Sequence, residues 1–186
     1  MKIITVFDIE NNTFLIKPDT ALLRNNDPYY IPSFTKRVEA RPYILVKIVR
    51  LAKSIDATFA SRLWESLSVA VEFAALDVLE DCKKKSLPWD AALSYDKSTA
   101  VSNDFVSLTE DLHIDIQRNE STLFCENTTN ISDTINTTLS KISHLVTLKI
   151  GDMVILPLGR ETVEVKIGDY ITATCNDTSI LDFDIK

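Results

Sequence analysis

The sequence predicts a mixed α/β domain in which β-strands dominate, rolled into a barrel-like sandwich with a few short helices. In the first half, short apolar runs alternate with polar breaks, which is typical of strands joined by turns. At residues 112–117, apolar and polar residues alternate with period two, as in a half-buried strand. The sequence Lys-Ile-Gly-Asp then occurs twice, at 149–152 and 166–169, each time before a strand-like run. The C-terminal part therefore predicts several antiparallel strands rolled together.

Four strands are expected in the first half, at 3–7, 14–16, 43–49 and 66–71. The run Tyr-Ile-Leu-Val-Lys-Ile-Val at 43–49 is almost continuously apolar and contains several β-branched residues. We therefore expect this strand to be covered on both faces.

Two helices are expected, at 74–85 and 131–145. The first has an apolar face and ends in Lys83-Lys84-Lys85, where cations suit the helix dipole, so we interpret the lysine run as a solvated helix end. Pro88 prevents its continuation. The second has an apolar stripe at helical spacing, with Asn130 or Ser132 as its cap.

Turns are predicted between the later strands. Asn119-Glu120 separates the strand at 112–117 from the one at 122–124, which predicts a hairpin. Gly151 and Gly168 each precede an aspartate in the repeated sequence, so we expect turns with positive φ at both glycines.

Composition bounds the class of protein. The chain has 186 residues and a net charge of −7, which suits a single domain over 1–186 and disfavours nucleic-acid binding. No apolar run is long enough to span a membrane. Three cysteines without paired spacing are typical of free thiols in a reducing compartment, so we expect a cytoplasmic protein.

An exported glycoprotein is a further hypothesis. Six asparagines begin an Asn-x-Ser/Thr sequon, but the N-terminus reaches acidic residues too soon for a signal peptide. The sequons are Asn11, Asn119, Asn127, Asn130, Asn136 and Asn176.

General catalytic motifs are absent from the sequence. With three glycines in all, the chain has no phosphate-binding glycine loop, and it contains neither HExxH nor GxSxG. Its two histidines, His113 and His144, fall on a predicted strand and a predicted helix, so we interpret both as structural or surface residues.

The segment ALDVLEDCKKKSLPWDAALSYDKSTAVS at 75–102 resembles the central segment of the fumarylacetoacetate hydrolase family. FLIKPDTALL at 14–23, VEARPYILVKIV at 38–49 and KISHLVTLKIGDMVILPLG at 141–159 resemble other landmarks of the family in the same order. The resemblance covers nearly the whole chain. It implies a β-rich roll, a homodimer, and hydrolase, decarboxylase or isomerase activity on acylpyruvates and related β-keto acids.

The resemblance also implies a Mg²⁺ or Mn²⁺ site held by three carboxylates, a donor set that such hard cations prefer. The corresponding positions here are Glu39, Arg41 and Glu72. A guanidinium in place of the second ligand repels a cation and suits a forked ion pair with both carboxylates. We therefore expect a degenerate site without metal or other cofactor, in which Arg41 pairs with Glu39 and Glu72.

Other functional positions of the family also differ. Leu93 replaces a lysine that helps to bind the substrate carboxylate, and Leu156 and Leu158 fall in the cradle for substrate oxygens. Leu76 replaces an arginine. We therefore expect no competent catalytic set and a pocket filled with hydrophobic side chains.

The region that supplies a His-Glu pair in the family's hydrolases is expected to be deleted. Only residues 8–13 separate Phe7 from Phe14, and this segment has no histidine.

The remaining candidates for a substrate pocket are Arg41, Asp77, Trp89 and Asp96.

Two functions follow from these departures. The leading hypothesis is a divergent family member that has lost the metal-dependent activity and acts as a scaffold, a partner or a binder of a small anionic ligand. The alternative is an active enzyme with altered chemistry on a small oxo acid. In that case Glu39, Glu72 and Asp96 supply the carboxylates, Arg41 orients the substrate, and Mg²⁺ or Mn²⁺ is a cofactor if the site still binds one.

Overall fold

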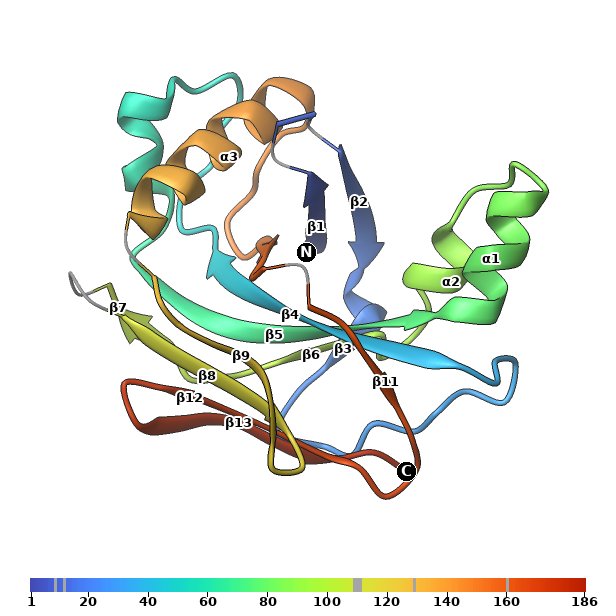
Figure 1. Ribbon diagram of the computed structural model, residues 1–186. Coiled ribbons are helices and arrows are strands. Elements are labelled where there is room, and N and C mark those ends of the chain that lie inside the picture. The colour runs from blue at the N-terminus through green and yellow to red at the C-terminus, as the bar shows by residue number, and fades with distance from the viewer. Residues whose placement is uncertain (9, 12, 109–111, 129, 160) are drawn as a thin grey trace.

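The computed structural model describes residues 1–186 except 9, 12, 109–111, 129 and 160. Among the described residues the strands form two sheets, and helices lie at two places around them (Figure 1). The larger sheet has the order β2-β1-β10-β4-β5-β6-β3, with β11 beside β4 and β7 beside β5. The smaller sheet has the order β13-β12-β8-β9. The predicted strand-dominated mixed fold is therefore confirmed.

The strands of the larger sheet are β1 (Lys2–Asp8), β2 (Thr13–Pro18), β3 (Leu22–Leu23), β4 (Val38–Lys47), β5 (Ser66–Ala75), β6 (Thr99–Val101), β7 (Val106–Ser107), β10 (Met153–Pro157) and β11 (Val163–Val165). Those of the smaller sheet are β8 (His113–Arg118), β9 (Ser121–Asn127), β12 (Tyr170–Cys175) and β13 (Thr178–Asp184).

The antiparallel pair β4–β5 forms the centre of the larger sheet and curves over the smaller one (Figure 1). Successive side chains of a strand point to opposite faces. Even-numbered residues of β4, such as Ile44 and Val46, pack into the main core with the apolar face of the smaller sheet. Odd-numbered residues point the other way, and Tyr43 and Leu45 belong to a second apolar cluster. Both faces of this strand are thus covered, as its sequence predicts.

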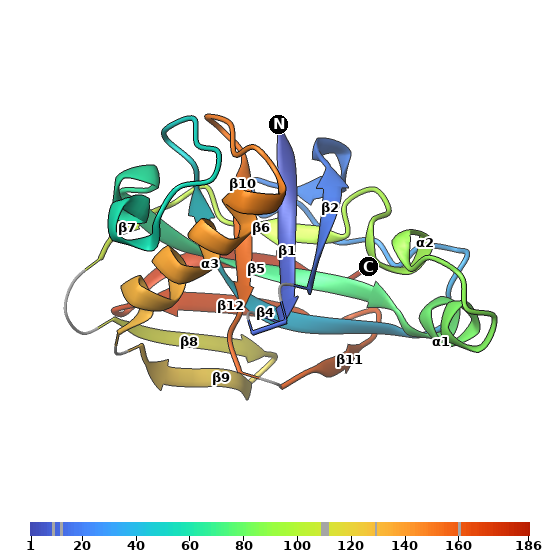
Figure 2. The same ribbon diagram turned by 90° about the horizontal axis from the view of Figure 1, so that it is seen from above.

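Helices occupy the two ends of this strand pair. Helices α1 (Leu76–Lys84) and α2 (Asp90–Leu93) lie at the end where β5 finishes, and α3 (Ile131–Leu145) lies at the other (Figures 1 and 2). The 3-10 helix η2 (Ala57–Leu63) packs against α3, and a second one, η1 (Asp19–Ala21), follows β2.

The bounds of one predicted helix agree with the structure, and those of the other differ at its start. α3 has the predicted bounds, and Asn130 is its N-cap residue, in a left-handed conformation and without a side-chain capping hydrogen bond. α1 begins two residues later than predicted because Ala74 and Ala75 continue β5 and pair with β4. Leu76, Val78 and Leu79, which form its expected apolar face, are only half-buried, and the buried residue of the helix is Cys82.

The repeated Lys-Ile-Gly-Asp sequence forms the same turn twice. Gly151 has φ +88° and Gly168 has φ +93°, as predicted. In each copy the aspartate accepts a hydrogen bond from the backbone N–H of the lysine three residues earlier, at 2.8 Å. The hairpin between β8 and β9 is also present, with Asn119 at positive φ.

β10, the strand after the turn at Gly151, departs from the expected antiparallel arrangement of the C-terminal strands. β10 pairs antiparallel with β4 but parallel with β1, so the C-terminal strands are not all antiparallel to their neighbours. The expected shortened connection at 8–13 includes residues 9 and 12, which lie outside the described residues. Within the described part of the chain, the helices are too short or too polar to cross a bilayer.

The buried face of α3 gives a test of the packing. Leu139 is fully buried, whereas Leu145 on the same helix is 56% exposed. We expect Leu139→Ala to lower the free energy of unfolding by about 2–5 kcal/mol, because it removes buried methyl groups and leaves a cavity. Leu145→Ala should change it by less than about 0.5 kcal/mol. Urea unfolding followed by circular dichroism checks both, and equal effects would contradict this packing.

Candidate functional site

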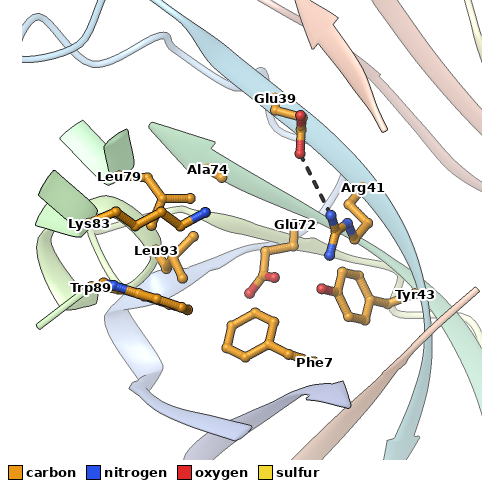
Figure 3. Close-up of a pocket in the computed structure, with 10 residues that line it drawn as sticks. All are labelled: Phe7, Glu39, Arg41, Tyr43, Glu72, Ala74, Leu79, Lys83, Trp89 and Leu93. Carbon is orange, nitrogen blue, oxygen red and sulfur yellow. Dashed lines mark ion pairs between the residues drawn. The ribbon is translucent and has the colours of Figure 1, made fainter. Parts of the chain in front are cut away.

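A cavity of about 210 Å³ lies over the face of β4 and β5 that points away from the main core (Figure 3). Glu39 and Arg41 are two residues apart on β4, so both face it, and Glu72 of β5 is the cross-strand partner of Arg41. α1 and the segment after it close the opposite side with Lys83 and Trp89. The strand register thus gathers the three positions expected from the sequence to form the metal site.

The ion pairs among these residues differ from the expected fork. Arg41 Nη2 lies 3.9 Å from Glu39 Oε1, at the limit of an ion pair. Glu72 pairs instead with Lys17 of β2, with Nζ 2.5 Å from Oε1, and Thr5 Oγ1 donates a hydrogen bond to the same oxygen at 2.9 Å. The predicted pairing of Arg41 is therefore correct for Glu39 and wrong for Glu72. Lys17 pairs with Glu72 because it is fully buried and its charge requires a partner there.

Lys17 is the residue that sequence reasoning missed. Its ammonium also donates to Thr99 Oγ1 at 3.0 Å and to Ser98 Oγ at 3.3 Å, so its three N–H groups have acceptors. Burial lowers the pKa of Lys17, and the nearby charge of Glu72 opposes this shift. The available signal was a lysine inside an apolar strand, immediately before Pro18.

Two polar atoms beside the cavity, Arg41 Nε and the hydroxyl of the fully buried Tyr43, make no hydrogen bond of good geometry to any residue that the structure describes. The hydroxyl nevertheless lies within the influence of Glu72 and Arg41, so Arg41 Nε is the atom that clearly lacks an acceptor. Burial raises the pKa of Tyr43, and the negative charge of Glu72 raises it further, so the phenol stays protonated. Buried donors without partners are costly, and a polar molecule in the cavity would supply the missing acceptors.

The lysine run is only partly a solvated helix end. Lys83 lines the cavity, with Nζ 5.4 Å from the centre of the Trp89 ring, a cation–π contact (Figure 3). Lys85 forms an exposed ion pair with Asp81 at 2.7 Å. The sequence pattern located the helix end but not the direction of Lys83, which depends on the position of Trp89.

Of the four pocket candidates, Arg41 and Trp89 line the cavity and two aspartates do not. Asp77 lies at the start of α1, where it accepts hydrogen bonds from the Thr35 hydroxyl and the Lys36 backbone N–H. These bonds hold the pKa of Asp77 below its usual range, and its role is to fix the preceding loop. Asp96 is exposed and lies outside the lining.

The expectation of a pocket filled with hydrophobic side chains is wrong. Leu93 lines the cavity, but Leu156 and Leu158 are buried in the main core, and Leu76 is half-buried outside the lining. The cavity keeps its volume and its charged walls. The two histidines lie away from it, on β8 and α3.

The residues at this site do not fit a divalent metal ion. Mg²⁺ and Mn²⁺ need several free carboxylate or carbonyl oxygens. Here the Arg41 guanidinium lies beside the carboxylate of Glu39, and the carboxylate of Glu72 is paired with Lys17. In the described part of the chain, no group of three or more His, Cys, Asp or Glu residues is placed to hold a metal. We therefore assign no step to a metal.

Comparison with known proteins agrees with this architecture. The profile of a family described as "Fumarylacetoacetate (FAA) hydrolase C-terminal" matches residues 5–185. The chain belongs to the fumarylacetoacetate hydrolase family.

Relatives and solved structures extend along nearly the whole chain. "Oxaloacetate tautomerase FAHD1, mitochondrial" from Bos taurus is 23% identical over 175 residues, covering 92% of this chain and 79% of the relative. "Oxaloacetate tautomerase YcgM" from Escherichia coli is 24% identical over 176 residues, covering 92% and 80%.

Fumarylpyruvate hydrolase from Pseudomonas aeruginosa, solved with Mn²⁺ and pyruvate, superposes with a TM-score of 0.85 at 15% identity, over 100% of this chain and 89% of that one. A putative family protein from Yersinia pestis superposes with a TM-score of 0.86 at 22% identity, over 100% and 92%. At these identities the solved structures establish the fold alone.

The buried ion pair gives a testable energetic effect. We expect Lys17→Met to lower the free energy of unfolding by about 3–5 kcal/mol, because it leaves the carboxylate of Glu72 buried without its counter-charge. Adding Glu72→Leu to this variant should restore much of the loss, since an apolar pair has no charge to desolvate. Denaturant unfolding measures all three proteins.

The matched control is Lys85→Met, which removes an ion pair that is exposed on both sides and should leave the unfolding midpoint close to that of the wild type. A Lys17→Met variant as stable as this control would show that the pair is not formed in solution.

Proposed function

We propose that this protein binds a small 2-oxo acid in the cavity and transfers a proton at the carbon next to the carbonyl, interconverting keto and enol forms. The proposal is supported by a cavity between two cations, Arg41 and Lys83, with the carboxylates of Glu39 and Glu72 on its wall and a buried donor, Arg41 Nε, without an acceptor among the described residues. The relatives named as oxaloacetate tautomerases support this class of reaction.

Arg41 and Lys83 supply the anion-binding groups. The guanidinium presents a planar fork that suits a carboxylate, and the Lys83 ammonium stands at the opposite wall (Figure 3). A 2-oxo acid has a carboxylate next to a carbonyl, so one cation binds the carboxylate and the other faces the carbonyl oxygen.

Glu39 is the candidate base. Its carboxylate is partly exposed and pairs with Arg41 at 3.9 Å, whereas Glu72 Oε1 is occupied by Lys17 and Thr5. In the proposed step, Glu39 takes a proton from C3. The C–H electrons form the C2–C3 double bond, and the carbonyl electrons move onto the oxygen, where the facing cation stabilises the negative charge. Return of a proton to that oxygen gives the enol.

Loss of activity is the second candidate function. Two features favour a protein that binds without catalysis: the apolar Leu93 in the cavity wall, and the pairing of the Glu72 carboxylate with Lys17. Such a protein would bind the same acids without turnover. The open, charged cavity and the relatives named as enzymes favour an active protein over this reading.

Proton exchange distinguishes the two. In D₂O containing a metal chelator, the proposed enzyme replaces the C3 hydrogens of pyruvate by deuterium, and one-dimensional proton NMR follows the loss of the methyl signal. We expect Glu39→Gln to slow this exchange by about 10²–10⁴-fold, the usual contribution of a general base. Pyruvate affinity, measured by calorimetry, should change much less.

Asp81→Asn is the matched control, because Asp81 is an exposed acid of α1 outside the cavity lining. It should exchange pyruvate at the wild-type rate. Tight pyruvate binding with exchange no faster than in buffer would contradict the enzyme and support the non-catalytic binder.

A further inference from the structure

A second, apolar cavity adjoins the charged one. It has a volume of about 330 Å³ and lies between β2 and the segment that joins α1 to α2. Phe7, Trp89 and Leu93 line both cavities, so these side chains form a common wall. Figure 3 shows the three on the side of the charged cavity away from Glu39. The two cavities therefore adjoin at these three side chains, with charged walls in one and apolar walls in the other.

The walls of the second cavity are mainly hydrocarbon. Besides the shared side chains, they include Phe14 and Leu15 of β2 together with Leu87 and Pro88. Leu87 is 49% exposed and Trp89 is 42% exposed, although burial of such large apolar side chains is favourable. This apolar surface is open to water in the free chain. Covering it with an apolar group lowers the free energy of the complex.

Charge in this cavity has one sign. Asp90 is its ionisable lining residue among the described residues, and Thr13 adds a hydroxyl. Arg41 and Lys83 line the first cavity and not this one. A second carboxylate on a ligand would therefore meet a like charge and apolar walls, whereas an alkyl or aryl group meets neither penalty.

We infer that the ligand is a 2-oxo acid with a single carboxylate and an apolar arm of several carbons, which lies in the cavity formed by Phe7, Phe14, Leu15, Leu87, Trp89 and Leu93. This inference rests on the proposed function, because the 2-oxo acid group must occupy the charged cavity for the arm to enter the apolar one. Leu93 is then a specificity residue, since it lines both cavities and the arm must pass it to reach the apolar one.

Calorimetric titration of the full chain with pyruvate, 2-oxopentanoate and 2-oxoheptanoate tests the inference. Each buried methylene should lower Kd about fourfold, so 2-oxoheptanoate should bind about two orders of magnitude more tightly than pyruvate. 2-Oxoadipate, which has the chain length of 2-oxohexanoate and a terminal carboxylate, should bind at least about tenfold more weakly than 2-oxohexanoate.

Two variants locate the arm. Leu87→Asp places a charge on the exposed wall of the apolar cavity and should remove most of the gain with chain length while leaving pyruvate binding unchanged. The control is Leu51→Asp, at a leucine that is 68% exposed and lines neither cavity, and it should keep the full gain.

The possible failures are distinguishable. Equal affinity for all chain lengths, with pyruvate bound, overturns the apolar arm and leaves the proposed function standing. No binding of any of these acids overturns both. If Leu87→Asp changes the molecular mass in light scattering and leaves the chain-length gain intact, a second copy of the chain covers this surface, and the inference is wrong.

Discussion

The buried ion pair between Lys17 and Glu72 is the interaction on which the site depends. It joins β2 to β5 across the face of the larger sheet, and threonine hydroxyls complete the hydrogen bonding of both charges. A charge in such a place is tolerated only with a close partner. Because Glu72 forms an ion pair with Lys17, its carboxylate is not free to coordinate a metal ion.

The Lys17–Glu72 pair also affects the charges that face the cavity. Arg41 lies opposite Glu72 in the strand register but forms its ion pair with Glu39, at a long distance of 3.9 Å. Its guanidinium therefore faces the cavity with Lys83 on the other wall. The described lining carries two cations, Arg41 and Lys83, and two carboxylates, Glu39 and Glu72. Lys17 balances the charge of Glu72 from outside the lining, so the two cations face one further carboxylate, although the whole chain has a net charge of −7. A ligand that displaces water from the cavity would strengthen its own attraction to these cations, because electrostatic interactions are weaker in water.

Local patterns predicted much of the fold. Short apolar runs located strands in the first half, and period-two alternation located the one at 112–117. The apolar stripe at helical spacing gave α3 its bounds, and the two glycine turns required positive φ. The family resemblance placed Glu39, Arg41 and Glu72 together, and strand alternation explains why they share a face. Where a strand continues into a helix, as at Ala74 and Ala75, the pairing with β4 decided the boundary, and no local pattern contains that information.

The pairing of charges could not be read from the sequence. Lys17 and Glu72 are far apart in the chain, and only the order of the strands brings their side chains to the same buried point. The direction of Lys83 likewise depends on Trp89, beyond the end of its own helix. Asp77 illustrates the opposite error: its match to a family position suggested a pocket residue, but its oxygens are used by the Thr35 hydroxyl and nearby backbone N–H groups.

We propose that fixed cations of the chain, and not a divalent metal, hold the ligand in this cavity. The most direct test is calorimetric titration of metal-stripped protein with 2-oxohexanoate, once with a chelator and once with excess Mn²⁺. If the cations hold the ligand, Kd is the same in both conditions, and Arg41→Ala weakens binding at least about tenfold with or without Mn²⁺. Binding that requires Mn²⁺ would contradict this proposal, and would mean that Glu72 leaves Lys17 to coordinate the metal.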